Sequence, residues 1–390
     1  MSNCILVLNA GSSSLKFAVY PVSPGEPLLR GKIDGLGHAP RFSARDTMGR
    51  ALEAGALSTI AADSPYEAIS ERLRDWLKVQ LAGSRLAAVG HRVVHGGTKY
   101  DKRVRVDETV LEDLERLTPL APLHEPHNIA AIRAAHRAAP DIPQIACFDT
   151  SFHRTQPRLA QLFAIPRALT EQGILRYGFH GLSYEYIASV LPQHLGDRAE
   201  GRVIVAHLGN GASLCAMKNR KSVATSMGLT ALDGLMMGER CGAIDPGVVL
   251  YLQQAMGLSV QEVSDLLYKK SGLLGVSGVS ADIRELTAST DPRAAEAIGL
   301  FVYRAAREVG ALATLLGGLD ALVFTAGIGE NTAEVRSGIA GYLGWIGVAL
   351  DQDANQSATA RISSAESSVD VLIIPTDEEG VIAKHVREYL

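Results

Sequence analysis

Three glycine-rich turns, each beside strand-like apolar runs, have the composition of a phosphate-binding site. They occupy residues 9–14, 207–213 and 327–331. Glycine lets the backbone approach a phosphate closely and turn its N–H groups toward it. Each turn by itself is more typical of an ordinary hairpin or strand-to-helix connection. Three such turns in two matching parts of the chain favour a site for a polyphosphate.

Two arginines supply the charge that such chemistry needs. Arg240 lies among Met, Cys and Gly rather than in a charged run, and Arg92 lies in a predicted strand at residues 86–94. Because side chains alternate along a strand, Arg92 and Val94 share one face. A cationic donor beside an apolar wall suits a small carboxylate with a short alkyl tail. The two guanidinium groups are therefore predicted to steady a phosphoryl group during its transfer.

Several other polar residues lie in loops, after a strand or at the start of a helix, where functional groups are often found. His124 and His180 lie in loop-like segments, where an isolated polar residue is usually just solvated. Asp149 directly follows a predicted strand, the position at which open α/β sheets place functional groups. Glu378 and Glu379 open the last predicted helix. They either favour the helix dipole or bind Mg²⁺, which prefers one or two carboxylates with phosphate oxygens and water.

Composition limits the classes of function. The 390 residues are 47% hydrophobic and 21% charged, with a net charge of −4. This length predicts two or three domains, and the charge gives no reason to expect a nucleic-acid or membrane partner. The apolar run at residues 4–8 is too short for a signal peptide, and the run at 309–324 is broken by glycines and an aspartate. The four cysteines form no CxxC pair, so no zinc or redox motif is indicated. We expect a cytoplasmic protein.

The order of predicted elements indicates a duplicated α/β chain. Both halves contain a strand, a small-residue turn, a Ser-Leu pair and a second strand. Strands are predicted at residues 5–8, 15–20, 86–94, 144–148, 202–208, 214–218, 321–325 and 371–374, with a further edge element at 33–43. Helices are predicted at residues 65–81 (with Asp63 and Ser64 as candidate caps), 110–117, 128–138, 248–256, 260–268, 292–316 and at the C-terminus.

At these residues the sequence resembles the acetate kinase family, of the acetate and sugar kinase, Hsc70 and actin superfamily. The resemblance covers essentially the whole chain, in eight blocks that follow one another in order. They are residues 9–16, 91–97, 148–153, 177–181, 207–213, 225–247, 324–332 and 375–379.

The resemblance implies an α/β fold with duplicated actin-like (ribonuclease H-like) domains and an interdomain active-site cleft. Residues 1–149 would form the N-terminal domain, with the helix at 377–390 packed back on it. Residues 150–376 would form the C-terminal domain, used for nucleotide binding and dimerisation. The implied reaction is the reversible transfer of the γ-phosphoryl group of ATP to acetate, giving acetyl phosphate and ADP. Mg²⁺, or alternatively Mn²⁺, would accompany the nucleotide, and the protein would be a homodimer.

Site residues follow from the resemblance, position by position. The residues that would act on the phosphoryl group and orient the acetate are Arg92, Asp149, His180 and Arg240. Those that would bind the acetate, in part as walls of a methyl pocket, are Arg92, Val94, Leu123, His124, Phe179 and Ala231. Those that would surround the nucleotide are Lys16, His207, Leu208, Gly209, Asn210, Gly211, Asp282, Ile283, Arg284, Gly327, Ile328, Gly329 and Asn331. Asn9 and Glu378 would position the metal.

The chain departs from the family pattern at four of its positions. Ala231 replaces a proline that lines the acyl pocket, so it can enlarge that pocket. Ile283 replaces a phenylalanine, which puts base stacking there in doubt. Asp377 replaces an asparagine and adds a charge near the predicted metal, and Glu239 replaces a small hydroxyl residue next to Arg240.

Two alternatives remain open at this stage. Val94 argues for a short acyl pocket and Ala231 for a longer one, so propionate or butyrate is an alternative acceptor. One methylene in an apolar pocket is worth only about 1–3 kcal/mol. A non-catalytic, actin-like ATP-binding scaffold would keep the phosphate-binding turns but would not need Arg92 and Arg240.

Overall fold

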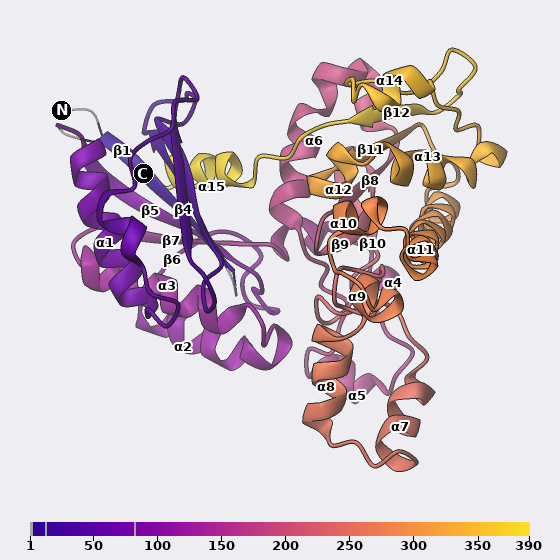
Figure 1. The fold of residues 1–390 in the computed structure, drawn as a ribbon, viewed down its shortest axis with the longest axis horizontal. Helices are drawn as coiled ribbons and strands as arrows, with labels where there is room; N and C mark the ends of the chain where they lie inside the picture. The colour runs from indigo at the N-terminus through magenta and orange to yellow at the C-terminus, as the bar shows by residue number, and fades with distance from the viewer. Residues whose placement is uncertain (1–2, 12–13, 82) are drawn as a thin grey trace. The chain divides into compact units, whose positions relative to one another are not determined.

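The computed structural model describes residues 3–11, 14–81 and 83–390 of the chain (Figure 1). The chain divides into two compact units. Unit 1 comprises Met1–Ser151 and Asp377–Leu390, and unit 2 comprises Phe152–Thr376. The last helix of the chain therefore belongs to the first unit.

Unit 1 is built on a mixed sheet whose strand order is β4-β3-β2-β1-β5-β7-β6. Strand β1 runs parallel to β5, and β5 runs parallel to β7, so the carboxyl ends of all three lie at one edge. The other neighbouring pairs are antiparallel. The strands are β1 Asn3–Ala10, β2 Ser14–Pro21, β3 Leu29–Asp34, β4 Arg41–Asp46, β5 Arg85–Val93, β6 Val104–Arg105 and β7 Gln144–Phe148.

Helices cover both faces of the unit 1 sheet. Helices α1 (Tyr66–Gln80) and α3 (Glu125–Ala138) bury Leu73 and Ala135 in one core with Leu6, Phe17 and Val89 of the sheet. Helix α15 (Glu378–Arg387) packs on the other face, close against β5. A Cβ at Gly90 would lie 2.6 Å from Ile382, so only glycine lets this helix approach so closely. Helix α2 (Glu108–Leu117) completes the unit beside α3.

Unit 2 repeats the arrangement of strands β3, β2, β1, β5 and β7. Its order is β10-β9-β8-β11-β12, with antiparallel β10-β9-β8 and parallel β8-β11-β12. The predicted duplicated α/β fold is therefore confirmed. The strands are β8 Arg202–Leu208, β9 Ala212–Lys218, β10 Lys221–Thr225, β11 Ala321–Thr325 and β12 Asp370–Ile373.

Helices α6 (Gly181–Leu195) and α11 (Pro292–Leu316) lie on opposite sides of the unit 2 sheet (Figure 1). Both faces of β11 are covered, so all five of its residues are buried. None of the helices in the described part of the chain is long and apolar enough to cross a membrane. The shorter helices of this unit are α4 Arg158–Gln161, α5 Arg167–Glu171, α7 Pro246–Gln254, α8 Val260–Lys269, α9 Gly272–Ser277, α10 Ile283–Ala288, α12 Ala326–Asn331, α13 Ala333–Gly341 and α14 Gln352–Gln356.

Three local predictions were wrong. The edge element at residues 33–43 is the end of β3 and the start of β4, joined by a turn in which Gly35 has φ +73°. Neither Asp63 nor Ser64 caps α1, because the cap position is Pro65, which has no side-chain donor or acceptor. The glycine-rich turn at residues 327–331 lies in helix α12, where Ala326 rather than a glycine takes the left-handed conformation, with φ +65°.

Candidate active site

Three predicted residues meet at the carboxyl edge of the unit 1 sheet. Asn9 and Arg92 lie near the ends of β1 and β5, and Asp149 follows β7. The Arg92 Nε donates to both carboxylate oxygens of Asp149 at 3.1 Å, and its Nη2 donates to Oδ2 at 2.6 Å. Its Nη1 donates to Oδ1 of Asn9 at 3.2 Å. The parallel register of the three strands thus fixes the guanidinium group from two sides.

The pair formed by Arg92 and Asp149 is largely removed from water. The exposed fraction of the side chain is 17% for Arg92 and 1% for Asp149. Burial by itself lowers the pKa of Arg92, but the negative charges of Asp149 and Glu378 outweigh it and raise that pKa above its ordinary value. Arg92 is therefore a permanent cation whose orientation depends on Asp149.

Two carboxylates at the start of α15 converge on Asn9. The Asn9 Nδ2 donates to Oε2 of Glu378 at 3.4 Å and to Oε1 of Glu379 at 3.3 Å. The carboxylate of Asp377 has other partners. It caps α15 by accepting from the Gly380 amide, and it pairs with Arg30 at 3.0 Å. The charge that this departure adds near the predicted metal is thus already neutralised.

This set of donors fits a magnesium ion that arrives with a nucleotide. Such an ion takes one or two carboxylates and completes its shell with phosphate oxygens and water. Glu378 and Glu379 supply that number. A cage made by protein alone is not present in the described residues, which contain no group of three or more His, Cys, Asp and Glu side chains placed to hold a metal.

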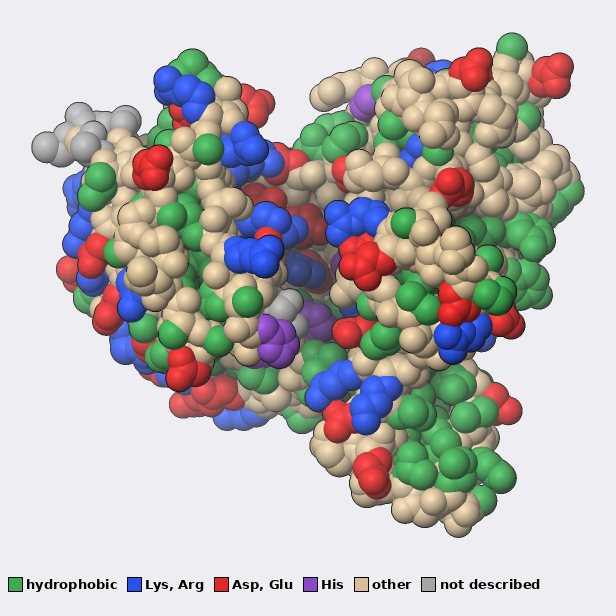
Figure 2. All heavy atoms as spheres, in the orientation of Figure 1, with side chains coloured by type: hydrophobic (Ala, Val, Ile, Leu, Met, Phe, Trp, Pro, Cys, Tyr) green, Lys and Arg blue, Asp and Glu red, His purple; other side chains and the backbone are tan. Residues whose placement is uncertain are grey.

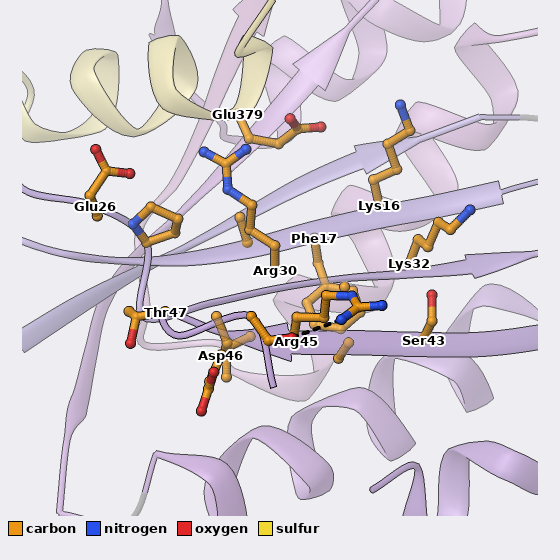
Figure 3. Close-up of a pocket in the computed structure, with 16 residues that line it drawn as sticks. Lys16, Phe17, Glu26, Arg30, Lys32, Ser43, Arg45, Asp46, Thr47 and Glu379 are labelled. Atoms are coloured by element: carbon orange, nitrogen blue, oxygen red, sulfur yellow. Dashed lines mark hydrogen bonds between the residues drawn. The ribbon is translucent and has the colours of Figure 1, made fainter. Parts of the chain in front are cut away.

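Lys16 lies on the same face of the sheet as Asn9, on the neighbouring strand β2. In the register of the strands, Asn9 lies opposite Lys16, Lys16 opposite Lys32, and Lys32 opposite Ser43. Residues paired in this way share a face. Figure 3 shows Lys16 and Lys32 on this face, with Glu379 nearby, in a cavity of about 550 Å³. The predicted nucleotide-binding residue Lys16 therefore lies in one row with the predicted metal residue Asn9.

Val94, a predicted acyl-pocket residue, is held by an asparagine of α3. The Asn128 Oδ1 accepts from the amide of Val94 at 3.0 Å, and its Nδ2 donates to the carbonyl of Ala10 at 2.8 Å. Val94 is buried, whereas Leu123 and His124 are partly exposed just before α3. Asn128 thus ties the start of α3 to the ends of β5 and β1. Ser12 and Ser13 of the first predicted turn lie outside the described residues.

Glu125 is a buried acid that the sequence analysis did not single out. Its side chain has no exposed surface, although it directly follows the partly exposed His124. Burial raises the pKa of Glu125 to about 8, and the charge of Asp149 acts in the same direction. The carboxyl group is therefore mostly protonated at neutral pH. The only signal in the sequence was an acid three residues before a predicted helix, a position at which the side chain is usually solvated.

In unit 2, backbone geometry positions His180. This residue precedes α6 with φ +56°, a left-handed conformation that is uncommon for residues other than glycine. The buried ring of His153 accepts from or donates to Ser222 at 2.9 Å through Nδ1, and its Nε2 donates to the carbonyl of Phe179 at 2.9 Å. Gly178 makes this packing possible, since a Cβ there would lie 2.6 Å from His153.

His180 and Arg240 come together over the loop between β8 and β9. A Cβ at Gly211 would lie 2.7 Å from Nη2 of Arg240 and 3.2 Å from Nε2 of His180. The Arg240 Nη1 donates to the carbonyl of Ala231 at 2.6 Å. Glu239 is exposed. The structure thus brings both predicted phosphoryl-contacting side chains of this unit to the glycine-rich loop.

His207 and Ser213 hold the ring of His180 in place, by stacking and by a hydrogen bond. The rings of His180 and His207 stack with centroids 4.1 Å apart. The Nδ1 of His180 is 2.8 Å from the hydroxyl of Ser213, and the Nδ1 of His207 is 2.9 Å from that of Ser183. The Nε2 of His180 faces Gly211, since a Cβ there would lie 3.2 Å from it.

The predicted nucleotide segments of unit 2 also lie close to this loop. The carbonyl of Asn210 accepts from the Gly238 amide at 3.1 Å, and a Cβ at Gly238 would lie 3.3 Å from the carbonyl of Ala281. A Cβ at Gly209 would lie 3.7 Å from Ala326, the first residue of α12. The segments at residues 209–211, 281–282 and 326–331 therefore start near one another.

Not every predicted nucleotide residue offers its side chain. Leu208, Ile283 and Ile328 are buried in the core of unit 2, so they can contribute only through the backbone. Asp282 caps α10 and pairs with Arg284 at 2.5 Å. Three further predicted residues, Gly327, Gly329 and Asn331, lie in α12. The Nδ2 of Asn331 donates to the carbonyl of Gly327 at 2.8 Å, and Gly329 is buried.

A family model described as the Acetokinase family matches residues 4–384. This chain belongs to the acetokinase family. The resemblance seen in its eight sequence blocks is thereby confirmed. The acetate kinase of Rhodopseudomonas palustris is 53% identical over 394 residues, which cover 99% of this chain and 98% of that relative. The acetate kinase of Methylocella silvestris is 48% identical over 399 residues, covering 100% and 98%.

Solved structures of kinases named for short carboxylates have the same fold. A propionate kinase from Francisella tularensis has a TM-score of 0.90 and 39% identity, with 99% of each chain covered. The acetate kinase of Porphyromonas gingivalis has a TM-score of 0.85 and 38% identity, with 98% of each chain covered. The protein is thus a kinase of the acetokinase family. It shares its fold with a propionate kinase and with an acetate kinase.

Proposed function

We propose that this protein is an acetate kinase, which transfers the γ-phosphoryl group of ATP to acetate and yields acetyl phosphate and ADP. Its membership of the acetokinase family supports ATP as donor and a short carboxylate as acceptor. The observation that carries the proposal is that each unit holds the arginine assigned to the phosphoryl group in a fixed position. Asp149 and Asn9 orient Arg92, and the Ala231 carbonyl anchors Arg240 beside Gly211.

The chemistry needs charge stabilisation rather than a general base. A carboxylic acid with a pKa of about 4 is already ionised at neutral pH, so the acceptor oxygen needs no proton removed. The obstacle is the approach of an anion to a polyanion. Arg92 and Arg240 answer it by neutralising charge on the acceptor and on the phosphoryl oxygens, while His180 contacts the same oxygens through Nε2. The acceptor oxygen bonds to phosphorus as the bond to the ADP oxygen breaks, in line.

We assign a bound magnesium ion to Glu378, with Asn9 and Glu379 beside it. The ion would neutralise phosphate charge. Mn²⁺ has the same preference for oxygen ligands and is an alternative. The nucleotide itself is assigned to Lys16, to the β8–β9 loop and to the start of α12.

Arg240→Ala tests the role of the second arginine. An arginine that acts on the transition state is worth about 10³–10⁵ in rate in comparable phosphoryl transfers, so kcat should fall far more than the KM for acetate rises. Arg220, an exposed arginine paired with Glu200, provides the matched control Arg220→Ala, which should keep both parameters. A change in KM alone would reassign Arg240 to substrate binding.

Propionate is the second candidate acceptor. The solved propionate kinase has the same fold, and Ala231 is a small buried residue at a position assigned to the acyl pocket. We would measure kcat/KM with ATP and Mg²⁺ for acetate, propionate and butyrate in parallel. Acetate ahead by tenfold, about 1.4 kcal/mol, supports the acetate kinase. Propionate equal or ahead would mean that Ala231 has opened the pocket.

Absence of turnover on all three carboxylates would reject the kinase and leave an actin-like ATP-binding scaffold. Such a scaffold would be detected by sedimentation as nucleotide-dependent polymers.

We also propose that the protein is a homodimer and that α7 lies in its interface. Helix α7, which the structure describes in full, has no buried residue although it carries Val248, Leu250 and Tyr251. Hydrophobic side chains gather over this helix (Figure 2). Apolar surface of this kind usually marks a contact with another protein. Leu250→Glu should yield monomers in sedimentation velocity, whereas Leu159→Glu, at a leucine of α4 that is 85% exposed, should not. A dimeric Leu250→Glu protein would place the interface elsewhere.

A further inference from the structure

Unit 1 contains a second cavity, on the face of the sheet opposite to Asn9 and Arg92. It lies between the sheet and helices α1 and α3 and has a volume of about 490 Å³. Small-molecule sites typically occupy about 300–1,000 Å³. The walls are almost wholly apolar and include Leu6 and Leu8 of β1, Leu73 and Leu77 of α1, and Ala135 of α3.

The cavity exists because α3 presents small side chains to it. Ala135, Ala138 and Ala139 of this segment line the space, where longer side chains would fill it. Protein interiors are otherwise packed about as densely as organic crystals, so an open apolar space forgoes contacts. An apolar ligand would restore them, whereas water gains little in a space lined by leucines.

The rim of the cavity has a different chemistry. Arg74, Lys78 and Arg85 line it, and Lys78 and Arg85 are exposed, which places them at the opening. Asp75 pairs with Arg74 at 3.0 Å and with Lys78 at 3.5 Å but does not itself line the cavity. None of the lining residues within the described part of the chain is acidic. The opening is therefore positively charged above an apolar interior.

We propose that this cavity binds a medium-chain alkanoate, with the alkyl chain among the leucines and the carboxylate at Lys78 and Arg85. The charge at the rim selects an anionic head. The buried walls are apolar except for the Ser70 hydroxyl and the Cys4 thiol, so they select a hydrocarbon tail. Acetate would leave the walls uncovered, so this ligand is distinct from the acceptor of the proposed reaction. The proposal does not rest on that reaction, because binding can be measured without turnover.

The position of the cavity links it to the candidate active site through the same strands. Cys4, Leu6 and Leu8 of β1 and Val89 of β5 face the cavity. The same two strands carry Asn9 and Arg92. A ligand that fills the cavity therefore contacts the elements that position both functional side chains.

Titration calorimetry with hexanoate, octanoate and decanoate, below their micelle concentrations, tests the proposal. Each buried methylene contributes about 0.8 kcal/mol, so the affinity should rise about fourfold per carbon. Decan-1-ol, which has the same chain without the charge, should bind at least fivefold more weakly than decanoate. Decanoate should also raise the melting temperature of the whole protein.

Paired variants separate the two parts of the site. Ala138→Leu should fill the cavity and abolish decanoate binding, whereas Ala130→Leu, on the same helix but outside the cavity, should not. The double variant with Lys78→Gln and Arg85→Gln should weaken decanoate at least fivefold and leave decan-1-ol unchanged. Lys102→Gln, at an exposed lysine outside the rim, should have no effect. If Ala138→Leu fails to fold, Ala139→Leu serves the same purpose.

Three results would overturn the proposal. One is equal affinity for decanoate and decan-1-ol, which would remove the role of the basic rim. Another is wild-type affinity in the Ala138→Leu protein, which would place the chain elsewhere. The third is no binding of any alkanoate by the wild-type protein. Each is independent of whether the enzyme phosphorylates acetate.

Discussion

The substitution Gly211→Ala tests how closely Arg240 and His180 lie over the β8–β9 loop. The added Cβ would lie 2.7 Å from Nη2 of Arg240, whereas ordinary contact begins at 3.4 Å. The guanidinium group must therefore retreat by about 0.7 Å. Gly211 does not have a positive φ, so alanine brings no backbone strain of its own. The substitution displaces a charged group while leaving the loop able to form.

The expected effect is a loss of rate without a loss of stability. A misplacement of about 1 Å can cost about 10²-fold in rate, so we expect kcat for acetyl phosphate formation to fall by about 10- to 100-fold. The end of an arginine side chain moves readily, so the free energy of unfolding should change by less than about 1 kcal/mol. Both quantities can be measured on one preparation, by initial rates at saturating ATP and acetate and by urea unfolding.

A glycine elsewhere in unit 2 provides the control. Gly299 lies on an exposed turn of α11 with nothing within 4 Å of its added Cβ. Gly299→Ala should keep the wild-type kcat and raise stability by up to about 1 kcal/mol, because alanine favours the helix. A Gly211→Ala enzyme with wild-type kcat would refute the reasoning, since Arg240 would then act from a position that the structure does not show. A loss of more than about 1 kcal/mol of stability in Gly211→Ala would also contradict the prediction, because the loss of rate could then reflect a damaged loop.

Further predictions concern the groups around the two arginines. Asp149→Asn should lower kcat/KM for acetate by at least tenfold and lower the free energy of unfolding in urea, because it leaves the largely buried Arg92 without its charged partner; a variant with normal kinetics would contradict this. Ser213→Ala should lower kcat severalfold with little change in KM, since the hydroxyl orients the ring of His180; an equal rise in KM would assign Ser213 to substrate binding. Glu125→Gln should become progressively more stable than the wild type between pH 5 and pH 8. The reason is that the raised pKa of Glu125 keeps it neutral when folded while the unfolded chain ionises, so its contribution to stability is present at low pH and lost as the pH rises toward 8. Urea unfolding at the two pH values checks this, and a constant difference would show that Glu125 is ionised in the folded protein.

Many elements of the fold were predictable because their signals are local. The strands at residues 144–148, 202–208 and 321–325 and the long helix at 292–316 have the bounds that the sequence predicted. Each is an apolar run or a periodic segment with glycine, proline or a charged residue next to at least one of its ends, so neighbours in sequence suffice. Where the signal was weak, as at residues 33–43, the prediction merged two short strands that pair with each other.

The site was predictable as a set of residues but not as an arrangement. Family resemblance singled out Arg92, Asp149, Asn9 and Glu378 individually. That Arg92 pairs with a residue 57 positions away, and Asn9 with one 369 positions away, follows only from the parallel strands and from the return of α15 to unit 1. Contacts between positions so far apart in sequence have no local signal.

The sequence by itself determined the class of fold, the duplicated order of strands and the family, because turns, periodicity and motifs are properties of neighbouring residues. Only the tertiary structure decided the environment of each functional group. It removed Glu125 from water and so raised its pKa, placed His180 in a left-handed conformation, and set Gly211 beneath Arg240. Burial and electrostatic interaction depend on distance in space, which the order of residues does not specify until the strands have paired and the helices have packed on them.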